Sequence, residues 1–212
     1  MSPFVALTAV AAPLDVPDLA TDTLFPSRFL DRPLGPDYAR YLFHDLRFTA
    51  DGARRADFIL NRPGFESARI LVAASNFGCG SAREGAVYAL VAYGVRAVVA
   101  PSFGGIFEGN CLANGIVPVR LADDVTTRLR GQLRDRPGAE MTVDLARQVV
   151  VGPDGTAHPF VLDAFWKRRL IQGLDGVAAT LEHAAQIDAF EDIYRRELDW
   201  LFIGPEASAP RP

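Results

Sequence analysis

Residues 70–100 read ILVAASNFGCGSAREGAVYALVAYGVRAVVA, and this stretch has the most regular pattern of apolar runs and turn residues in the chain. The short apolar run over residues 68–74 predicts a buried β-strand. Residues 82–93 have helical composition, and Gly94 fits the position just past the end of a helix. A second strand is predicted over residues 95–100, so the stretch encodes a strand, a glycine-containing turn, a helix and another strand.

The same alternation continues toward the C-terminus, with a predicted helix over residues 105–113 and a third strand over 116–121. Strands that alternate with helices in this way predict an α/β fold with parallel strands and right-handed crossovers. The elements expected beyond them are a surface helix over 123–134, a hairpin of 141–145 with 148–151, and helical segments over 163–172 and 176–199.

The N-terminal part is less regular. Residues 1–30 are expected to form a strand, a loop and a short strand or turn, and residues 31–51 a long irregular loop. Its aromatic side chains fit either burial in the core or a functional lid. No internal repeat or linker interrupts the chain, so one domain is expected over residues 1–203, with a disordered, proline-containing tail at 204–212.

The composition excludes several classes of function. The chain has 212 residues, 49% of them hydrophobic, a net charge of −4 and no basic stripe, which argues against a nucleic-acid partner. No apolar run approaches about 18 residues, so no transmembrane helix is expected. The first residues carry no Lys or Arg of the kind that begins a secretory signal, and we therefore expect a cytoplasmic chain.

The metal-binding residue types are scarce. Cys79 and Cys111 are the two cysteines, and the three histidines are far apart without metal-ligand spacing. A structural zinc ion needs about four such ligands and an iron–sulfur cluster three or four thiolates. We therefore expect neither a disulfide scaffold nor a metal site or cluster held by this chain alone.

The turn between the first predicted strand and helix is suited to an anion. Gly78 and Gly80 allow a tight turn and a close approach of the backbone to a ligand, and a helix that begins here directs free N–H groups into the turn. Ser81 with Glu84 three residues later also fits a capping box, so Ser81 has a structural explanation. Arg83 opposes the helix dipole, which leaves an anionic ligand or a surface ion pair as its partner.

Other site types fit the turn less well. Arg83 stands where a dinucleotide fingerprint needs its third glycine, and no lysine precedes Ser81 as a phosphate-binding loop would require. Cys79 could be an activated thiolate near the helix, but no histidine is nearby in sequence and a small buried cysteine is the commoner case.

The turn also resembles a family signature. Residues 76–84, NFGCGSARE, resemble the NFGCGSSREH signature of the small subunit of 3-isopropylmalate dehydratase. The resemblance spans residues 13–195, and it includes Thr21-Asp22, Pro26-Ser-Arg-Phe-Leu30 and the segment from Tyr41 to Phe48. It implies an aconitase-like swivelling β/β/α domain with C-terminal helices. It also implies a large-subunit partner with a [4Fe–4S] cluster and dehydration and rehydration of a dicarboxylate.

The resemblance assigns roles to individual residues. Ser81 matches the base of the aconitase family, and Arg83 matches an arginine that binds a substrate carboxylate. Arg28 is implied as a second basic contact, Asp22 as the acid that orients these arginines, and Gly80 as part of the substrate-binding turn. Tyr41 and Phe43 lie where the family has its specificity loop, so we expect this loop to close over the site and select the substrate side group.

Three residues depart from the family pattern: Ala82 replaces a serine, Gly85 a histidine, and Ala20 an aspartate. These departures leave open a paralogous hydro-lyase that acts on another substituted malate, of the citramalate, dimethylmaleate or homocitrate type. Two hypotheses from other classes are a non-catalytic carboxylate-binding module and a thiol enzyme that uses Cys79. Neither of them requires Ser81 and Arg83 together.

Overall fold

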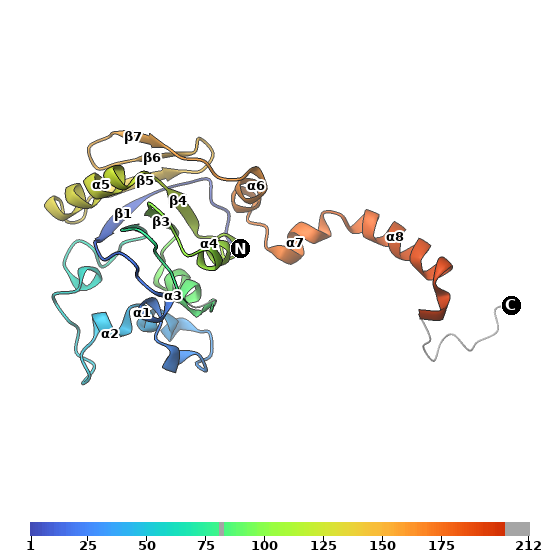
Figure 1. The fold of residues 1–212 in the computed structure, drawn as a ribbon, viewed down its shortest axis with the longest axis horizontal. Helices are drawn as coiled ribbons and strands as arrows, with labels where there is room; N and C mark the ends of the chain where they lie inside the picture. Colours follow the sequence, from blue (N-terminus) through green and yellow to red (C-terminus); the bar gives the residue numbers. More distant parts are fainter. Residues whose placement is uncertain (81–82, 202–212) are drawn as a thin grey trace. The chain divides into compact units, whose positions relative to one another are not determined.

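The computed structural model describes residues 1–80 and 83–201. The chain divides into two compact units, Met1–Gly173 and a smaller unit that begins at Leu174 (Figure 1). The expected single domain over residues 1–203 stays a prediction, and the expected disordered tail at 204–212 lies outside the described residues.

The first unit is built on a seven-stranded sheet with the order β4-β3-β2-β1-β5-β6-β7 (Figure 1). The strands are β1 (Ala6–Leu14), β2 (Ile70–Ala73), β3 (Ala97–Ala100), β4 (Val117–Arg120), β5 (Glu140–Asp144), β6 (Val149–Val151) and β7 (Ala157–Pro159). Strands β1 to β4 pair in parallel, which confirms the parallel strands predicted from the alternating pattern. Strands β5 and β6 form the predicted hairpin.

Strand β1 joins the parallel and antiparallel halves of the sheet. Its C-terminal part pairs in parallel with β2, in the register Ala11 to Ile70, and its N-terminal part pairs antiparallel with β5, in the register Ala6 to Asp144. Strand β7, which pairs antiparallel with β6, was not expected from the sequence. It has three residues and contains Pro159, so its local strand signal is weak.

The predicted helices of the first unit are present. They are α3 (Gly85–Tyr93), α4 (Gly105–Ala113), α5 (Asp123–Asp135) and α6 (Ala164–Gln172). Gly94 caps α3 in the left-handed conformation with a φ of 102°, as its position in the sequence predicts. Asp163 caps α6 by accepting a hydrogen bond from the backbone N–H of Phe165.

The start of α3 differs from the prediction. The helix begins at Gly85 with Glu84 as its N-cap, so Glu84 does not stand at the third helical position that the capping-box alternative requires. The reason lies upstream, where Cys79 still forms a bridge with Ala20 and Gly80 adopts a φ of 94°. The chain therefore reaches a helical path several residues later than its composition suggests. Ser81 itself lies outside the described residues.

The N-terminal loops contain more helical turns than expected. Short helices occur in them as α1 (Thr21–Leu24), η1 (Ser27–Phe29), η2 (Pro36–Tyr41), α2 (His44–Arg47) and η3 (Ile59–Asn61). Aromatic stacking holds them, with ring centroids 5.1 Å apart for Phe25 and Tyr38 and 4.4 Å apart for Phe29 and Tyr41. The expectation of an irregular loop was therefore wrong in part, because packed rings impose local order that has no sequence period.

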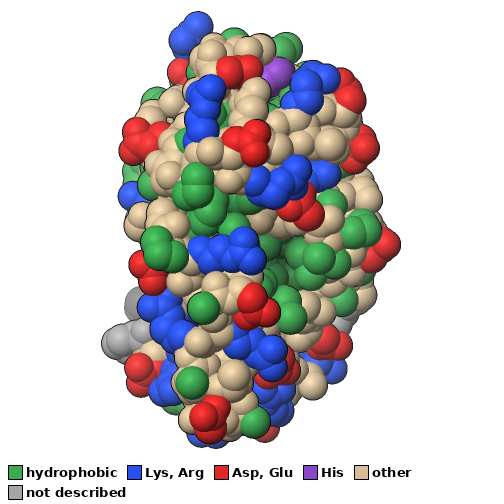
Figure 2. All heavy atoms as spheres, turned by 90° about the vertical axis from the view of Figure 1, so that its left-hand side faces the viewer, with side chains coloured by type: hydrophobic (Ala, Val, Ile, Leu, Met, Phe, Trp, Pro, Cys, Tyr) green, Lys and Arg blue, Asp and Glu red, His purple; other side chains and the backbone are tan. Residues whose placement is uncertain are grey.

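One face of the molecule, on the left of Figure 1, carries charged side chains of both signs in an interspersed pattern (Figure 2). Hydrophobic side chains gather in a hollow near the middle of this face. The described residues on this face do not form the single-sign basic stripe that is typical of nucleic-acid binding.

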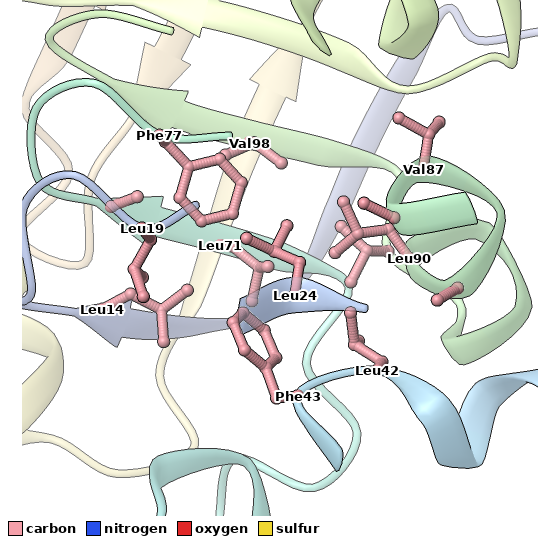
Figure 3. Packing of buried hydrophobic residues seen from close by; sticks show 14 of the residues in the cluster. Leu14, Leu19, Leu24, Leu42, Phe43, Leu71, Phe77, Val87, Leu90 and Val98 are labelled. Atoms are coloured by element: carbon pink, nitrogen blue, oxygen red, sulfur yellow. The ribbon is translucent and has the colours of Figure 1, made fainter. Parts of the chain in front are cut away.

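The core has two layers, one on each side of the sheet. Leu71 of β2 packs on one side with Phe77 and Leu90 (Figure 3), whereas the neighbouring Ile70 and Val72 pack on the other side. Successive residues of a strand point to opposite faces, so this strand is apolar throughout because both of its faces are covered. Full burial of each large apolar side chain stabilises the fold by about 1.5–3 kcal/mol.

The second unit consists of α7 (Gly176–Leu181), α8 (Ala184–Glu197) and η4 (Asp199–Leu201). Asp175 caps α7 through its side chain, which accepts a hydrogen bond from the N–H of Ala178 at 2.8 Å. The predicted helical segments and the break around Gly173 are confirmed. Within the described parts of the chain, no helix combines the length and apolar character needed to cross a membrane.

Candidate active site

Two loops meet at the ends of the neighbouring parallel strands β1 and β2. The N–H of Gly78 donates to the carbonyl of Leu19, and the N–H of Thr21 donates to the carbonyl of Cys79, each at 2.8 Å. The side chain of Asn76 also donates to Asp18, at 2.7 Å. The loop after β1 therefore lies against the glycine turn after β2, as expected at the carboxyl edge of a parallel sheet.

The glycine turn has no room for a larger residue at its centre. Gly78 has a φ of 74°, and a Cβ atom there would lie 2.2 Å from the ring of Phe107 in α4. A Cβ atom on Gly104 would lie 2.4 Å from the carbonyl oxygen of Gly78. The turn is therefore packed directly on the start of α4, and the two glycines permit this approach.

The meeting of the two loops brings Asp22 and Arg83 together. Arg83 Nη1 donates to Asp22 Oδ1 at 3.4 Å, and the two side chains are 48% and 62% exposed. Asp22 follows the loop after β1, and Arg83 follows the glycine turn just before α3. An arginine that a carboxylate orients and that still reaches solvent can bind an anionic ligand.

Arg28 has a different acidic partner from the one expected. Both of its terminal nitrogens donate to the carboxylate of Asp45, one of them at 2.9 Å, and Nη2 lies 3.3 Å from His44 Nδ1. Its guanidinium group also lies over the ring of Phe29, 4.5 Å from the centroid. The expectation that Asp22 orients both arginines therefore fits the contact of Arg83, whereas Arg28 is oriented by Asp45.

The hydrogen bond from Arg28 lowers the pKa of Asp45 from 3.8 to about 2, with a smaller contribution from His44. The same contact raises the pKa of Arg28. Both groups are therefore charged at neutral pH, and the carboxylate holds the guanidinium in a bidentate arrangement.

The pair lies in a polar cavity of about 470 Å³, which His44, Asp45, Thr49 and Arg55 line together with Arg28. Sequence reasoning did not select His44 or Asp45 as site residues. A signal was present, because both belong to the segment from Tyr41 to Phe48 that resembles the family. Their positions within a loop, without strand or helix periodicity, gave no indication of which arginine they would contact.

The two residues expected in the specificity loop lie in different surroundings. Tyr41 stacks on Phe29, next to Arg28, and is partly buried. Phe43 is 0% exposed, and its ring packs in the core 5.3 Å from that of Phe58. The structure therefore places Tyr41 beside the polar cavity and Phe43 beneath the loop that carries it.

A buried arginine fastens this loop. Arg47 Nη1 donates to the carbonyl oxygens of Ala39 and Leu42, at 2.9 and 3.2 Å. Its guanidinium lies 4.9 Å from the ring centroid of Tyr93 in α3, and burial lowers its pKa. Arg47 thus connects the loop backbone at Ala39 and Leu42 with Tyr93 of α3.

Gly85 stands where the family signature has a histidine, and aromatic side chains lie close to it in the structure. A Cβ atom at this position would lie 2.9 Å from the ring of Phe25, which stacks on Tyr38. The aromatic pair occupies the space next to Gly85, so a side chain there would require the rings to move.

The cysteines do not provide a set of metal ligands. Cys111 is fully buried, and burial raises the pKa of its thiol well above the ordinary value. Cys79 is partly buried, with its sulfur 3.3 Å from the carbonyl oxygen of Asp18. Within residues 1–80 and 83–201, no group of three or more His, Cys, Asp or Glu side chains is placed to hold a metal ion. These residues do not fit the ligands of an iron–sulfur cluster.

Comparisons with known proteins show the family of the chain. The aconitase C-terminal domain family matches residues 2–124, and the LeuD_N family matches residues 127–164. The 3-isopropylmalate dehydratase small subunit of Paramagnetospirillum magneticum is 43% identical over 201 residues, which cover 95% of this chain and 100% of that protein. The small subunit of the same name from Brevibacillus brevis is 42% identical over 191 residues, covering 90% and 98%.

A solved structure shows the same fold. The crystal structure of 3-isopropylmalate dehydratase from Methanocaldococcus jannaschii matches with a TM-score of 0.62 at 24% sequence identity, and the match covers 88% of this chain and 99% of that one. The fold is therefore that of an aconitase C-terminal domain, and the predicted fold class is confirmed. Within that class, the chain belongs to the family of 3-isopropylmalate dehydratase small subunits.

Proposed function

We propose that the chain is the small subunit of a 3-isopropylmalate dehydratase, a hydro-lyase of leucine biosynthesis that interconverts 2-isopropylmalate and 3-isopropylmalate by dehydration and rehydration. The observation that carries this proposal is the contact of Arg83 with Asp22 at the glycine turn, because it prepares a guanidinium group for a substrate carboxylate. The relatives that match over nearly the whole chain support the same reaction in preference to that of a paralogous hydro-lyase.

The chain works in this proposal with a large subunit in the cytoplasm. The large subunit holds a [4Fe–4S] cluster, since the described residues of this chain do not fit such a group. When bound, the cluster supplies a Lewis acid for the hydroxyl group and one carboxylate of the substrate.

Ser81 acts as the base that removes a proton from the carbon next to the hydroxyl-bearing carbon. It lies outside the described residues, directly after Gly80 and two positions before Arg83. A serine needs its alkoxide stabilised, and the positive charge of Arg83, two positions further along the chain, can contribute to that field. Gly80, with a φ of 94°, keeps the backbone at this point free of a side chain.

The arginines hold the substrate dicarboxylate. Arg83 binds one carboxylate, and Asp22 limits the orientation of its guanidinium group. Arg28 supplies a second basic contact from the polar cavity, where Asp45 keeps it oriented. The loop of Tyr41 selects the substrate side group, and the buried Phe43 supports that loop from below.

The proposal is tested by reconstituting the chain with the large subunit of a relative and measuring isomerisation of 2-isopropylmalate. Ser81→Ala is expected to lower kcat by at least about 100-fold, the contribution of a positioned base. Ser81→Asn, which keeps a polar side chain but has no hydroxyl group, should not restore turnover. Near-normal kcat for Ser81→Ala in a folded complex would contradict the role of Ser81.

Substrate identity is tested in the same assay. The complex should convert 2-isopropylmalate with a higher kcat/KM than citramalate or dimethylmaleate. A preference for one of the latter would instead favour the paralogous hydro-lyase. Activity of the isolated chain without any large subunit would contradict the proposed division of labour.

A further inference from the structure

A separate pocket lies at the C-terminal end of β1. It has a volume of about 220 Å³. Its apolar walls come from the end of β1 and the loop after it, and from α2 and η3 with the residue before each: Leu14, Leu19, Phe43, Leu46, Phe58 and Ile59. Figure 2 shows a hollow with hydrophobic side chains on the face where this end of the sheet lies, with Lys or Arg side chains beside it. Of the described residues with a proposed contact to substrate, Asp22, Arg28, Gly80 and Arg83, none lines the pocket.

The charged residues of the pocket are unbalanced. Its lining includes Arg62, Arg134 and one carboxylate, Asp15. That carboxylate already accepts from two arginines, Arg130 Nε at 3.0 Å and Arg134 Nη1 at 2.5 Å. Arg62 donates to the backbone carbonyl of Asp57. A carbonyl is neutral, so this contact does not compensate the positive charge of Arg62. The lining therefore has an excess of positive charge next to apolar walls.

We propose that this pocket is a binding site for a small apolar monocarboxylate, with its alkyl chain against the apolar walls and its carboxylate at Arg62 and Arg134. A guanidinium group is suited to a carboxylate, and the excess positive charge disfavours a ligand that carries an ammonium group. The volume is below the usual range of about 300–1,000 Å³ for drug-sized ligands, so the ligand is the size of a small metabolite.

The same features separate this ligand from the dicarboxylate that we propose as substrate. The second carboxylate of a diacid of similar length would lie against the apolar walls, where a charged group without a partner is strongly disfavoured. The pocket should therefore distinguish a monocarboxylate from a dicarboxylate with the same number of carbon atoms.

Isothermal titration of the full chain with pentanoate tests this proposal. Pentanoate should bind, whereas pentanamide, which lacks the charge, and glutarate, which adds a second carboxylate, should each bind at least about tenfold more weakly. Equal binding of the amide would show that the arginines play no part. Equal binding of glutarate would show that the walls do not exclude charge, and either result would overturn the proposal.

Variants locate the binding site. Arg62→Gln and Arg134→Gln should each weaken pentanoate binding at least about fivefold. Arg128→Gln is the matched control, because Arg128 is exposed on the same helix as Arg134 but does not line the pocket, and it should leave binding unchanged. Arg62 is not one of the arginines that pair with Asp15. The binding measurement on Arg62→Gln therefore still tests the proposal if Arg134→Gln unfolds the chain. Loss of binding in Arg83→Gln with no effect of Arg62→Gln would place pentanoate at the substrate site and overturn the proposal.

Discussion

The ion pair of Arg83 with Asp22 is half exposed, and this exposure limits its contribution to the stability of the fold. Solvent-exposed pairs add only about 0–1 kcal/mol to the stability of a fold, because water screens them and both side chains lose freedom. The pair therefore adds little to the stability of the fold, which is compatible with the proposed role of Asp22 in orienting Arg83 toward a ligand.

Asp22→Asn separates these two contributions. We expect kcat/KM of the reconstituted enzyme to fall about tenfold, mainly through KM, since the amide orients the guanidinium less strongly than a carboxylate does. The free energy of unfolding should change by less than about 1 kcal/mol. Asp124→Asn, which removes the exposed partner of Arg128, is the control and should leave KM unchanged. Equal KM for Asp22→Asn and the wild-type chain would contradict the orienting role.

The contact of Asp45 with Arg28 predicts a pH dependence of stability. The pKa of Asp45 is lowered from 3.8 to about 2 in the fold, so its contribution is present above the unfolded-state pKa and is lost as the pH falls through that window. Because the Asp45 side chain is 57% exposed, we expect screening to limit the contribution to below about 1 kcal/mol.

Urea unfolding at pH 5 and pH 2.5 measures this contribution. Asp45→Asn should reduce the loss of stability between the two pH values, and Arg28→Gln should reduce it to a similar extent. The double variant should show no further reduction, since either substitution removes the same pair. Additive effects of the two substitutions would show that Asp45 titrates independently of Arg28.

At the scale of elements, the packing of the glycine turn on α4 is the feature most sensitive to substitution. Gly78→Ala would place a Cβ atom 2.2 Å from the ring of Phe107 at a φ of 74°, so it should lower the free energy of unfolding by more than about 2 kcal/mol. Gly105→Ala is the control, because a Cβ atom there meets nothing within 4 Å. It should be neutral or stabilise the chain by up to about 1 kcal/mol. Thermal and urea unfolding of both variants check this, and similar effects at the two positions would contradict the packing described.

The sequence predicted most of these elements because their signals are local. Strands β2 to β4 are short apolar runs bounded by turn residues, and the helices between them end at recognisable caps such as Gly94. The position of β1 between β2 and β5 could not be predicted, since its pairing of Ala6 with Asp144 joins residues that are far apart in the chain. The start of α3 was misplaced because the contact of Cys79 with Ala20 overrides helical composition.

The candidate site was predictable to a similar extent. The resemblance placed Asp22 and Arg83 in one site, and the parallel pairing of β1 and β2 brings them into contact. The partner of Arg28 was missed because Asp45 lies in a loop whose short helices depend on aromatic stacking. Tyr41 and Phe43 were treated alike, although the loop directs only Phe43 fully into the core.

At the scale of the whole molecule, burial is distributed unevenly between the two units. Both layers of the core lie within Met1–Gly173, and Leu170 is the last buried residue along the described chain. The described residues of the second unit include none that is buried, and α8 exposes large apolar side chains such as Phe190 and Ile193. Isolated helices of this length are marginal in water, so we expect the first unit, which holds both core layers, to unfold as a stable unit of its own.

A chain that ends at Gly173 tests whether residues 1–203 behave as one domain. We expect the shortened chain to unfold in a single cooperative transition, with a Tm within a few degrees of that of the full chain, because the core is complete without the second unit. Ending the chain at Asp163 is the control, since it removes α6 and with it Leu170, which is fully buried in the core. That chain should lose several degrees more, as loss of a buried leucine alone costs about 2–5 kcal/mol. Circular dichroism and calorimetry measure the unfolding of both chains. If removal of the second unit alone causes a large loss of stability, the C-terminal helices belong to the same cooperative domain.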